Sequence, residues 1–524
     1  MYKAALLRGN PYIKKRSELM ELKLERGAID VCRTIASCSA KQPFDTDLTL
    51  PDYCGDIKRI LHCGVQPQLR SVSAADERAA AQGEITVRLL YLNEQNEPDC
   101  LEQTLPLSVH CRCGKGAGDA VWCAAASAEY VNCRAVSPRK VQLDGSVTVH
   151  FEAYEKQAFS FVQTAEQCET QTQQIACSRM TAAAQKTFDL SETVALDDAE
   201  PPVAAIVQVI GTPLLQSTEA VDDKLLVKGE LRLEIICLAQ DKKIRRVSHT
   251  LPLSQVMEAP GLRGGDALDV SLRVQALYAG PKRDADDAQR LLDLAAKVSA
   301  QVKGFRDDSV QVVSDCYATQ GSLAPTFSDC RFARAFPLLP AQLNERQRTD
   351  TGVRDGALLF ASVAGVQTEA TFRDDAFLLM HHVTMDLLIR GGEDDAQYLT
   401  QTVDLEQTVP APDELTDPVF TPETTVLLDG AHLSQDGTLE AALSVSVSGT
   451  VYDGTSQRIL TDAACSDSEE AQTAQLILAF CAKGEDLWSI CKRYRTPVGV
   501  VKAENALDDD LLPEDRMLLI PAAT

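Results

Sequence analysis

The chain has 524 residues, of which 45% are hydrophobic but only 5% aromatic, so it can form several aliphatic cores. The formal net charge of −25 argues against binding to nucleic acid or to anionic membrane surfaces. The N-terminal residues lack the apolar run of an export signal, and no later run is long enough to span a membrane. We therefore expect a cytosolic protein whose 17 cysteines are reduced thiols.

The chain opens with an N-terminal segment, residues 1–29, that precedes the first repeated pattern. Within this segment, charged and apolar residues at Lys14–Leu24 are spaced as on two faces of a helix. A short amphipathic helix is expected there.

Two long stretches of the chain repeat each other at a fixed spacing. The pentapeptide TLPLS occurs at Thr104–Ser108 and again at Thr250–Ser254, an offset of 146 residues. The same offset pairs GEITVRLLYL, residues 83–92, with GELRLEIICL, residues 229–238. A fainter third copy follows at an offset of 298, where TMDLLI, residues 384–389, falls on TVRLLY of the first. The sequence therefore predicts tandem repeats at 30–175, 176–327 and 328–462, the third being degenerate.

Alternation of apolar and polar residues predicts strands within the repeats. Ile85, Val87 and Leu89 alternate with polar side chains, and residues 231–237 do the same in the second copy. Such one-sided strands are typical of antiparallel sheets that bury one face. We expect a mainly β protein of tandem β-sandwich-like domains. The exception is Asp284–Val298, whose first residues favour a helix.

A motif near the start of the first repeat points to a family. It consists of LPDYCGDIKRIL at Leu50–Leu61, followed by the strand that begins at Gly83 and by TLPLS. On these residues the repeats resemble the SPOCS family, which is named for its link to spore coats in spore-forming bacteria. The second repeat has ALDDAEPPVAAIVQVI, residues 195–210, in the motif's place and lacks its Pro-Asp. The resemblance extends over about residues 30–460 and implies a role in spore-envelope assembly.

The chain changes character after the repeats. A small, acidic stretch at 463–474 predicts a flexible linker. Residues 475–521 then begin with an apolar strand, Leu476–Ala482, and close with a second strand at Met517–Pro521. Two short helices are expected between them, which gives the order strand, helix, helix, strand.

The signals for the two helices are local. Asp486 stands where a helix N-cap belongs, because its carboxylate can accept from the first free amides. Pro497 can open the second helix. One face of the first helix consists of residues spaced at i, i+3, i+4 and i+7, namely Leu487, Ile490, Cys491 and Tyr494.

This terminal unit resembles a LysM domain. The resemblance rests on Gly484, Leu487-Trp488-Ser489-Ile490, Asn505, Leu507, Leu512 and Leu519-Ile520-Pro521. LysM domains commonly bind N-acetylglucosamine polymers such as peptidoglycan or chitin. The resemblance implies a groove between two loops, formed by Gly484, Glu485, Asp486, Leu487, Asn505, Leu507, Leu511 and Leu512.

The loops beside this groove depart from the family pattern by being acidic. Seven carboxylates are expected on the rim, namely Glu485, Asp486, Asp508, Asp509, Asp510, Glu514 and Asp515. They would repel acidic cell-wall polymers and favour a basic protein surface. Two partners therefore stay open: a peptidoglycan-type glycan, or a spore coat morphogenetic protein.

No catalytic motif is evident in the sequence. The segment HCRC at His110–Cys113 carries metal-ligand residue types but has no second half-site, so no metal is expected. His381 and His382 are adjacent in a predicted strand, which places them on opposite faces. We expect a protein that is not an enzyme and takes no cofactor.

The sequence therefore predicts a non-enzymatic scaffold of three SPOCS-like domains and a LysM tail. By resemblance, it would act in spore coat or envelope assembly, in the mother-cell cytoplasm at the forespore surface, with self-association through the repeats as a further option. The alternative is a peptidoglycan-binding cell-wall protein or an accessory of a cell-wall remodelling enzyme.

Overall fold

The structure is a computed structural model that describes residues 19–20, 23–75, 77–113, 120–166, 168–197, 201–284, 288–391, 396–466 and 476–521. Most of these residues lie in antiparallel strands, and the described part of the chain contains two short helices. The expectation of a mainly β protein is confirmed.

The first group of strands, called unit 1, forms two sheets. Its strands are β2 (Leu24–Thr49), β3 (Ile57–Ala75), β4 (Arg78–Asn93), β5 (Pro98–Arg112), β6 (Val121–Ser137) and β7 (Lys140–Ala165). They pair in the orders β2-β7-β6 and β3-β4-β5. The alternating residues Ile85, Val87 and Leu89 of β4 are fully buried against Val147 and Val149 of β7, so the apolar faces of both sheets share one core.

Unit 2 has the same arrangement. Its strands are β8 (Glu169–Ala195), β9 (Val203–Val221), β10 (Lys224–Ala239), β11 (Ile244–Glu258), β12 (Ala267–Lys282) and β13 (Leu291–Tyr317). They pair in the orders β12-β13-β8 and β11-β10-β9. Here too, one apolar cluster draws on both sheets.

Unit 3 departs from this pattern because its two long strands are each broken in two. Its strands are β14 (Ser322–Arg331), β15 (Arg334–Asp350), β16 (Ala357–Arg373), β17 (Ala376–Arg390), β18 (Ala396–Pro410), β19 (Pro418–Phe420), β20 (Glu423–Leu433), β21 (Thr438–Asp453) and β22 (Ser456–Ser466). One sheet has the order β16-β17-β18, and another has β15-β21-β19 with β20 also on β21. The outer pieces, β14 and β22, pair separately together with β1 (Leu19–Met20).

The repeat offset relates units 1 and 2 in space as well as in sequence. Gly83 in β4 and Gly229 in β10 both sit at a β-bulge in the pairing with the neighbouring strand. A Cβ on Gly83 would lie 1.9 Å from the carbonyl oxygen of Gln68, and a Cβ on Gly229 would lie 2.4 Å from that of Leu214. Gln68 and Leu214 are themselves 146 positions apart. The glycine is therefore repeated because the backbones approach closely there.

The three units also share a core at the joint between them. Leu90, Ile236 and Leu388 stand at equivalent positions of β4, β10 and β17 and pack in one cluster. The C-terminal parts of these strands are consequently buried on both faces, whereas the alternation had predicted one solvent-facing side along the whole strand. The other units cover the outer face of each central strand at this end.

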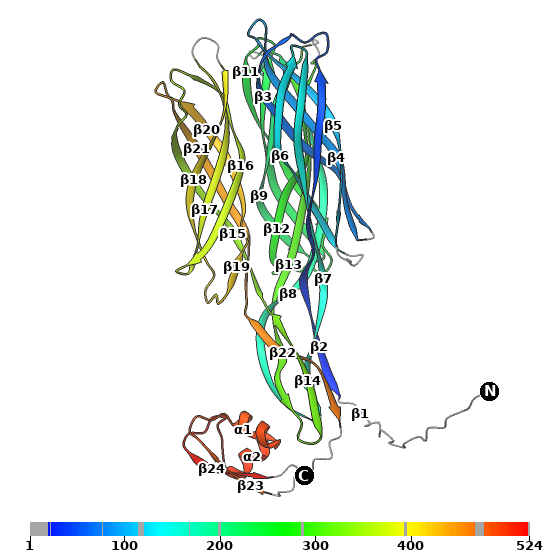
Figure 1. Ribbon diagram of the computed structural model, residues 1–524, viewed down its shortest axis with the longest axis vertical. Coiled ribbons are helices and arrows are strands. Elements are labelled where there is room, and N and C mark those ends of the chain that lie inside the picture. Colours follow the sequence, from blue (N-terminus) through cyan, green and yellow to red (C-terminus); the bar gives the residue numbers. More distant parts are fainter. Residues whose placement is uncertain are drawn as a thin grey trace, which may run out of the picture.

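The long strands of the units continue together into a stalk below the joint (Figure 1). Ile29 and Phe161 from unit 1, Val310 and Val312 from unit 2, and Ile459 from unit 3 pack there in one cluster. The stalk ends beside the helical C-terminal part of the chain (Figure 1).

Two helix expectations are not met by the described residues. Within Asp284–Val298, residues 285–287 of the expected helical start lie outside the described residues. The residues from Leu291 onward belong to β13, where Leu292, Leu294 and Ala296 alternate into the core. Alternation at period two suits this segment better than a helical stripe. Within Lys14–Leu24, the described residues form β1 and the start of β2, and the rest lies outside the described residues.

The first long strand of unit 2, β8, begins at Glu169, and β14 of unit 3 begins at Ser322. The repeat boundaries at 176 and 328 remain predictions. The linker expected at 463–474 begins as part of β22, and its remainder lies outside the described residues.

Candidate docking site on the C-terminal module

Residues 476–521, the C-terminal module, form a small unit of two strands and two helices. It consists of β23 (Leu476–Cys481), α1 (Leu487–Tyr494), α2 (Val498–Asn505) and β24 (Arg516–Pro521). β23 and β24 pair in antiparallel fashion. The elements of the module follow in the order strand, helix, helix, strand.

The expected helix cap at Asp486 and the expected helix start after Pro497 are both present. The Asp486 carboxylate accepts hydrogen bonds from the backbone amides of Trp488 at 3.3 Å and Ser489 at 3.2 Å, and so caps α1. The helix ends at Arg495, whose left-handed φ of 52° closes the last turn. Pro497 directly precedes α2.

The predicted inner face of α1 forms the core of the module. Leu487, Ile490 and Cys491 are buried, and Tyr494 is partly buried at the end of the stripe. They pack with Val501 of α2 and with the inward residues of the two strands.

The two loops that were expected to border a groove do lie together. Asp486 and Leu511 form an antiparallel bridge. The Gly484 amide donates to the Leu512 carbonyl at 2.8 Å, and the Leu512 amide donates to the Glu485 carbonyl at 3.2 Å. The loops therefore use part of their backbone hydrogen-bonding capacity on each other.

Several side chains of the expected groove point into the module. Leu487 and Leu512 are core residues. Asn505 is buried, and its amide nitrogen donates to the carbonyls of Val501 at 2.8 Å and Leu519 at 2.7 Å. Its side-chain oxygen accepts from the Leu519 amide at 2.7 Å. Asn505 therefore joins α2 to β24, and Leu487 and Leu512 fill the core.

The remaining groove residues are more accessible. Leu511 and Gly484 are exposed, whereas Leu507 packs partly against the core. Glu485 accepts from Arg493 Nη2 at 3.0 Å. The apolar surface left for a ligand between the loops is therefore essentially Leu511.

The acidic rim is partly neutralised within the module. Besides the helix cap and the Glu485 pair, Asp510 pairs with Lys502 at 2.6 Å, and Asp515 accepts from the Lys483 amide at 2.6 Å. The other acids of the rim, Asp508, Asp509 and Glu514, have no cationic partner among the described residues.

A second surface of the module was missed by the sequence analysis. The outward residues of β23 and β24 include Leu476, Leu478, Phe480 and Met517, all exposed, with Phe480 at 72% and Leu478 at 61%. Phe480 and Met517 are direct cross-strand partners. This set is called the outer apolar face. Its signal in the sequence was that LILAFC is apolar at every position, whereas a strand covered on one face needs apolar residues only at alternate ones.

The module is fixed to the end of the stalk by several contacts with β13. Trp488 Nε1 donates to Asp315 Oδ2 at 2.9 Å, and Lys492 Nζ lies 2.6 Å from both carboxylate oxygens. The Tyr317 hydroxyl donates to the Thr496 carbonyl at 2.8 Å, and its ring meets the Trp488 indole edge-on at 4.9 Å. Burial alone would raise the pKa of Asp315, but the hydrogen bonds from Lys492 and Trp488 outweigh burial and hold that pKa below its usual value.

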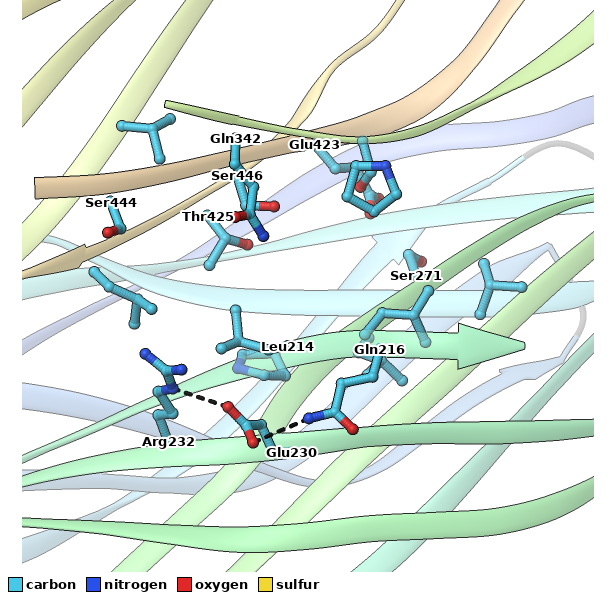
Figure 2. Close-up of a pocket in the computed structure, with 18 of the residues that line it drawn as sticks. Leu214, Gln216, Glu230, Arg232, Ser271, Gln342, Glu423, Thr425, Ser444 and Ser446 are labelled. Atoms are coloured by element: carbon cyan, nitrogen blue, oxygen red, sulfur yellow. Dashed lines mark hydrogen bonds and ion pairs between the residues drawn. The ribbon is translucent and has the colours of Figure 1, made fainter. Parts of the chain in front are cut away.

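A polar groove of about 510 Å³ lies between units 2 and 3 (Figure 2). The Glu230 carboxylate accepts from Gln216 Nε2 at 3.1 Å and Arg232 Nε at 2.9 Å, and Ser444 and Ser446 face the groove from the other unit. Its lining is rich in hydroxyl and amide groups. This groove could not be predicted from the sequence, because it forms only where two units meet.

Metal and membrane features can be stated for the described residues. No group of three or more His, Cys, Asp or Glu side chains comes close enough there to hold a metal ion. Both helices in this part of the chain have eight residues, too few to cross a bilayer. His381 is buried and His382 is partly exposed, as their alternation predicted.

Comparison with known families finds a match for one of the three units. Residues 202–281 match the family model described as SipL, SPOCS domain. The matched residues comprise β9, β10, β11 and nearly all of β12, which means that unit 2 carries the match even though it lacks the Pro-Asp motif of unit 1. The SPOCS family indicates a sporulation-related role. No curated protein matches the chain.

Proposed function

We propose that this chain is a non-enzymatic scaffold of spore coat or envelope assembly that docks to a coat-basement protein through its C-terminal module. The SPOCS match in unit 2 supports the sporulation setting. The same two-sheet strand order in unit 1 supports assigning that unit to the family as well. We assign the C-terminal module to the LysM class for two reasons. Its elements follow in the order strand, helix, helix, strand, and it carries the LysM-like residues Gly484, Leu487-Trp488-Ser489-Ile490 and Leu519-Ile520-Pro521.

The observation that carries the docking proposal is the outer apolar face. Exposed aliphatic and aromatic side chains that lie together on one sheet face are typical of protein contact sites. Phe480 supplies a large anchor, and Leu478 and Met517 lie beside it. The module is held at the end of the stalk, so the three units can present it at a fixed position.

A protein partner is favoured over a glycan for a physical reason. A glycan groove needs free backbone groups and a flat apolar floor. Between the two loops here, the Gly484 and Leu512 amides are already bonded, and Leu487 and Leu512 are buried. The unneutralised acids Asp508, Asp509 and Glu514 would further repel an anionic cell-wall polymer.

Peptidoglycan binding is the second candidate, and the meeting of the two loops supports it. Asp486 and Leu511 bridge the loops, and the exposed Leu511 side chain could lie under a sugar ring. In that case the contacts would involve the loop side of the module and not the outer apolar face.

The test uses the full-length protein with two variants and a control. The double variant Leu478→Ser with Phe480→Ser removes the outer apolar face, and Leu511→Ser removes the exposed apolar group of the loops. Val136→Ser, an exposed apolar residue of β6 in unit 1, is the matched control. Each protein is tested for binding to a purified coat-basement protein and for co-sedimentation with peptidoglycan.

The proposal predicts at least about a tenfold weaker affinity for the coat-basement protein in the double variant, or ~1.4 kcal/mol. Leu511→Ser and Val136→Ser should bind normally. The opposite result is peptidoglycan binding that is abolished by Leu511→Ser and retained by the double variant. That result would refute protein docking and establish peptidoglycan binding through the loops.

A further inference from the structure

Unit 1 differs from unit 2 in its thiols. Nine of the 17 cysteines fall between β2 and β7, namely Cys32, Cys38, Cys54, Cys63, Cys100, Cys111, Cys113, Cys123 and Cys133. Six of them border the core between the two sheets of this unit: Cys38, Cys54, Cys63, Cys111, Cys113 and Cys133. Four of those six are arranged as two facing pairs.

The first pair lies where β2 of one sheet packs along β5 of the other. Gln42 fixes this edge, because its side chain donates to the Pro106 carbonyl at 2.8 Å and accepts from the Ser108 amide at 2.8 Å. Next along this edge lie Ser39, three residues before Gln42 in β2, and Cys111, three residues after Ser108 in β5. The Cys111 thiol donates to the carbonyl of Ser39 at 3.7 Å. Ser39 directly follows Cys38.

Cys38 and Cys111 are hydrogen-bonded to each other at this edge. Both side chains are partly buried on the inner faces of their sheets, and both cysteines are free thiols that form no disulfide in this structure. Cys113 follows the end of β5, packs against the same core and lies close to Cys38.

The second pair lies at the opposite edge, where β3 packs along β6. Cys63 and Cys133 are partly buried there on facing sheets, and their thiols are hydrogen-bonded to each other. A link between them would join the two sheets on the side away from Cys38 and Cys111.

Unit 2 shows what these positions need for packing alone. By strand register, Ala184 and Met257 replace Cys38 and Cys111, since they oppose residues equivalent to those that the cysteines oppose. In the same way, Val209 and Ala279 replace Cys63 and Cys133. All four replacements are buried apolar residues of the unit 2 core. Apolar side chains therefore suffice to pack both edges, and the thiols of unit 1 add a chemistry that packing does not require.

We propose that Cys38–Cys111 and Cys63–Cys133 are two dithiol sites that close into intramolecular disulfides when the protein meets a small-molecule disulfide oxidant. In each reaction, one thiolate attacks the oxidant RSSR, forms a mixed disulfide and releases one RSH after protonation. The second cysteine then attacks the protein sulfur of the mixed disulfide, forms the intramolecular bond and releases the second RSH. Overall, the protein dithiol loses two electrons and two protons, and RSSR becomes two RSH.

At the second edge, Cys133 is the attacking group, because the interaction with Cys63 lowers the pKa of Cys133 and so raises its thiolate fraction. At the first edge, burial and the interaction with Cys111 raise the pKa of Cys38 to about 12, which lowers the thiolate fraction of Cys38. In a reducing cytosol both sites remain thiols, so the cross-links report transfer to an oxidising environment.

The experiment treats the reduced full-length protein with glutathione disulfide, alkylates the remaining thiols at timed intervals, and identifies linked peptides by mass spectrometry after digestion. The expected products are a Cys63–Cys133 link and a Cys38–Cys111 link, together with a melting temperature raised by several degrees. Cys133→Ser should lose the Cys63–Cys133 link and keep the Cys38–Cys111 link, and Cys38→Ser should do the reverse. Cys177→Ser, a buried thiol of β8, is the control and should form both.

Each other outcome counts against the proposal. Neither link in excess oxidant, or the same mixture of links from native and guanidinium-unfolded protein, would overturn it. A dominant Cys38–Cys113 link would overturn the assignment of Cys111. If Cys133→Ser melts far below the unmodified protein, Cys63→Ser provides the same test from the other side of the pair.

Discussion

Trp488 of α1 donates its indole N–H to the carboxylate of Asp315, near the end of β13, across 2.9 Å. Lys492, one helical turn further on, contacts the same carboxylate. One acid of the stalk therefore binds two side chains of the C-terminal module, next to the contacts that Tyr317 makes with Trp488 and Thr496. This matters for the proposed function, because a scaffold gains from holding its docking surface in a defined position.

Replacing Asp315 with Ala should loosen the module from the stalk. Two hydrogen bonds to a charged group are lost, and because both partners remain partly solvated we expect about 1–3 kcal/mol of docking free energy to disappear. With Trp122→Phe as the background, Trp488 is the sole tryptophan, and its emission should shift to longer wavelength. Asp329→Ala on β14, an exposed acid of the stalk, should leave the emission unchanged. Identical spectra for both variants would contradict the contact.

Two substitutions in the C-terminal module should separate its core from its outer apolar face. Leu487→Ala opens a cavity at a fully buried site and should cost roughly 2–5 kcal/mol of unfolding free energy. Phe480→Ser changes a side chain that is mostly in water and should stay within about 0.5 kcal/mol. Urea unfolding followed by Trp488 emission measures both. A large loss in Phe480→Ser would mean that this ring is covered in the folded protein.

The repeated glycines should not tolerate a methyl group. Gly83→Ala and Gly229→Ala each place Cβ against a backbone carbonyl that cannot rotate away, so each should destabilise its unit by about 2 kcal/mol or more. Gly365→Ala in β16 is the control, because a Cβ there would meet nothing within 4 Å. Thermal unfolding of the three variants gives the comparison, and equal melting temperatures would rule out the close backbone approach.

Unit 3 should show an acid sensitivity that depends on His381. Burial lowers its pKa, and the neutral ring is held by Thr368 at 2.9 Å and Gln407 at 3.1 Å. As pH falls below about 6.5, the unfolded chain takes up a proton that the folded chain resists, so stability falls. His381→Gln should therefore reduce the loss of stability between pH 7.5 and about 5.5 in urea titrations. His382→Gln, at the partly exposed neighbour, is the control. An unchanged pH slope in His381→Gln would show that this ring titrates freely in the folded state.

Features set by local sequence could be predicted. The Asp486 cap and the α1 stripe depend on residues a few positions apart, and the 146-residue offset places Gly83 and Gly229 equivalently. What failed depends on contacts between distant segments. The outer face of Leu90 looked solvent-facing because the covering strands belong to other units.

In the candidate site, too, the features that could not be predicted depend on contacts between separate elements. The resemblance to LysM domains implied that the loops of Gly484 and Leu511 lie side by side, and in the structure Asp486 and Leu511 form a bridge between these loops. It did not reveal that Leu512 and Asn505 face inward, which is determined by the packing of α2 on β24. The pairing of Cys63 with Cys133 was also invisible, because it requires the register of two separate sheets.

Docking of the proposed envelope scaffold through the outer apolar face is tested by the position of a fluorescent fusion in sporulating cells, for the unmodified chain and for the Leu478→Ser, Phe480→Ser variant. We expect a ring around the forespore that becomes diffuse in the variant, at equal protein level. Fluorescence at the growing cell wall, or a forespore ring that the variant retains, would overturn docking through this face.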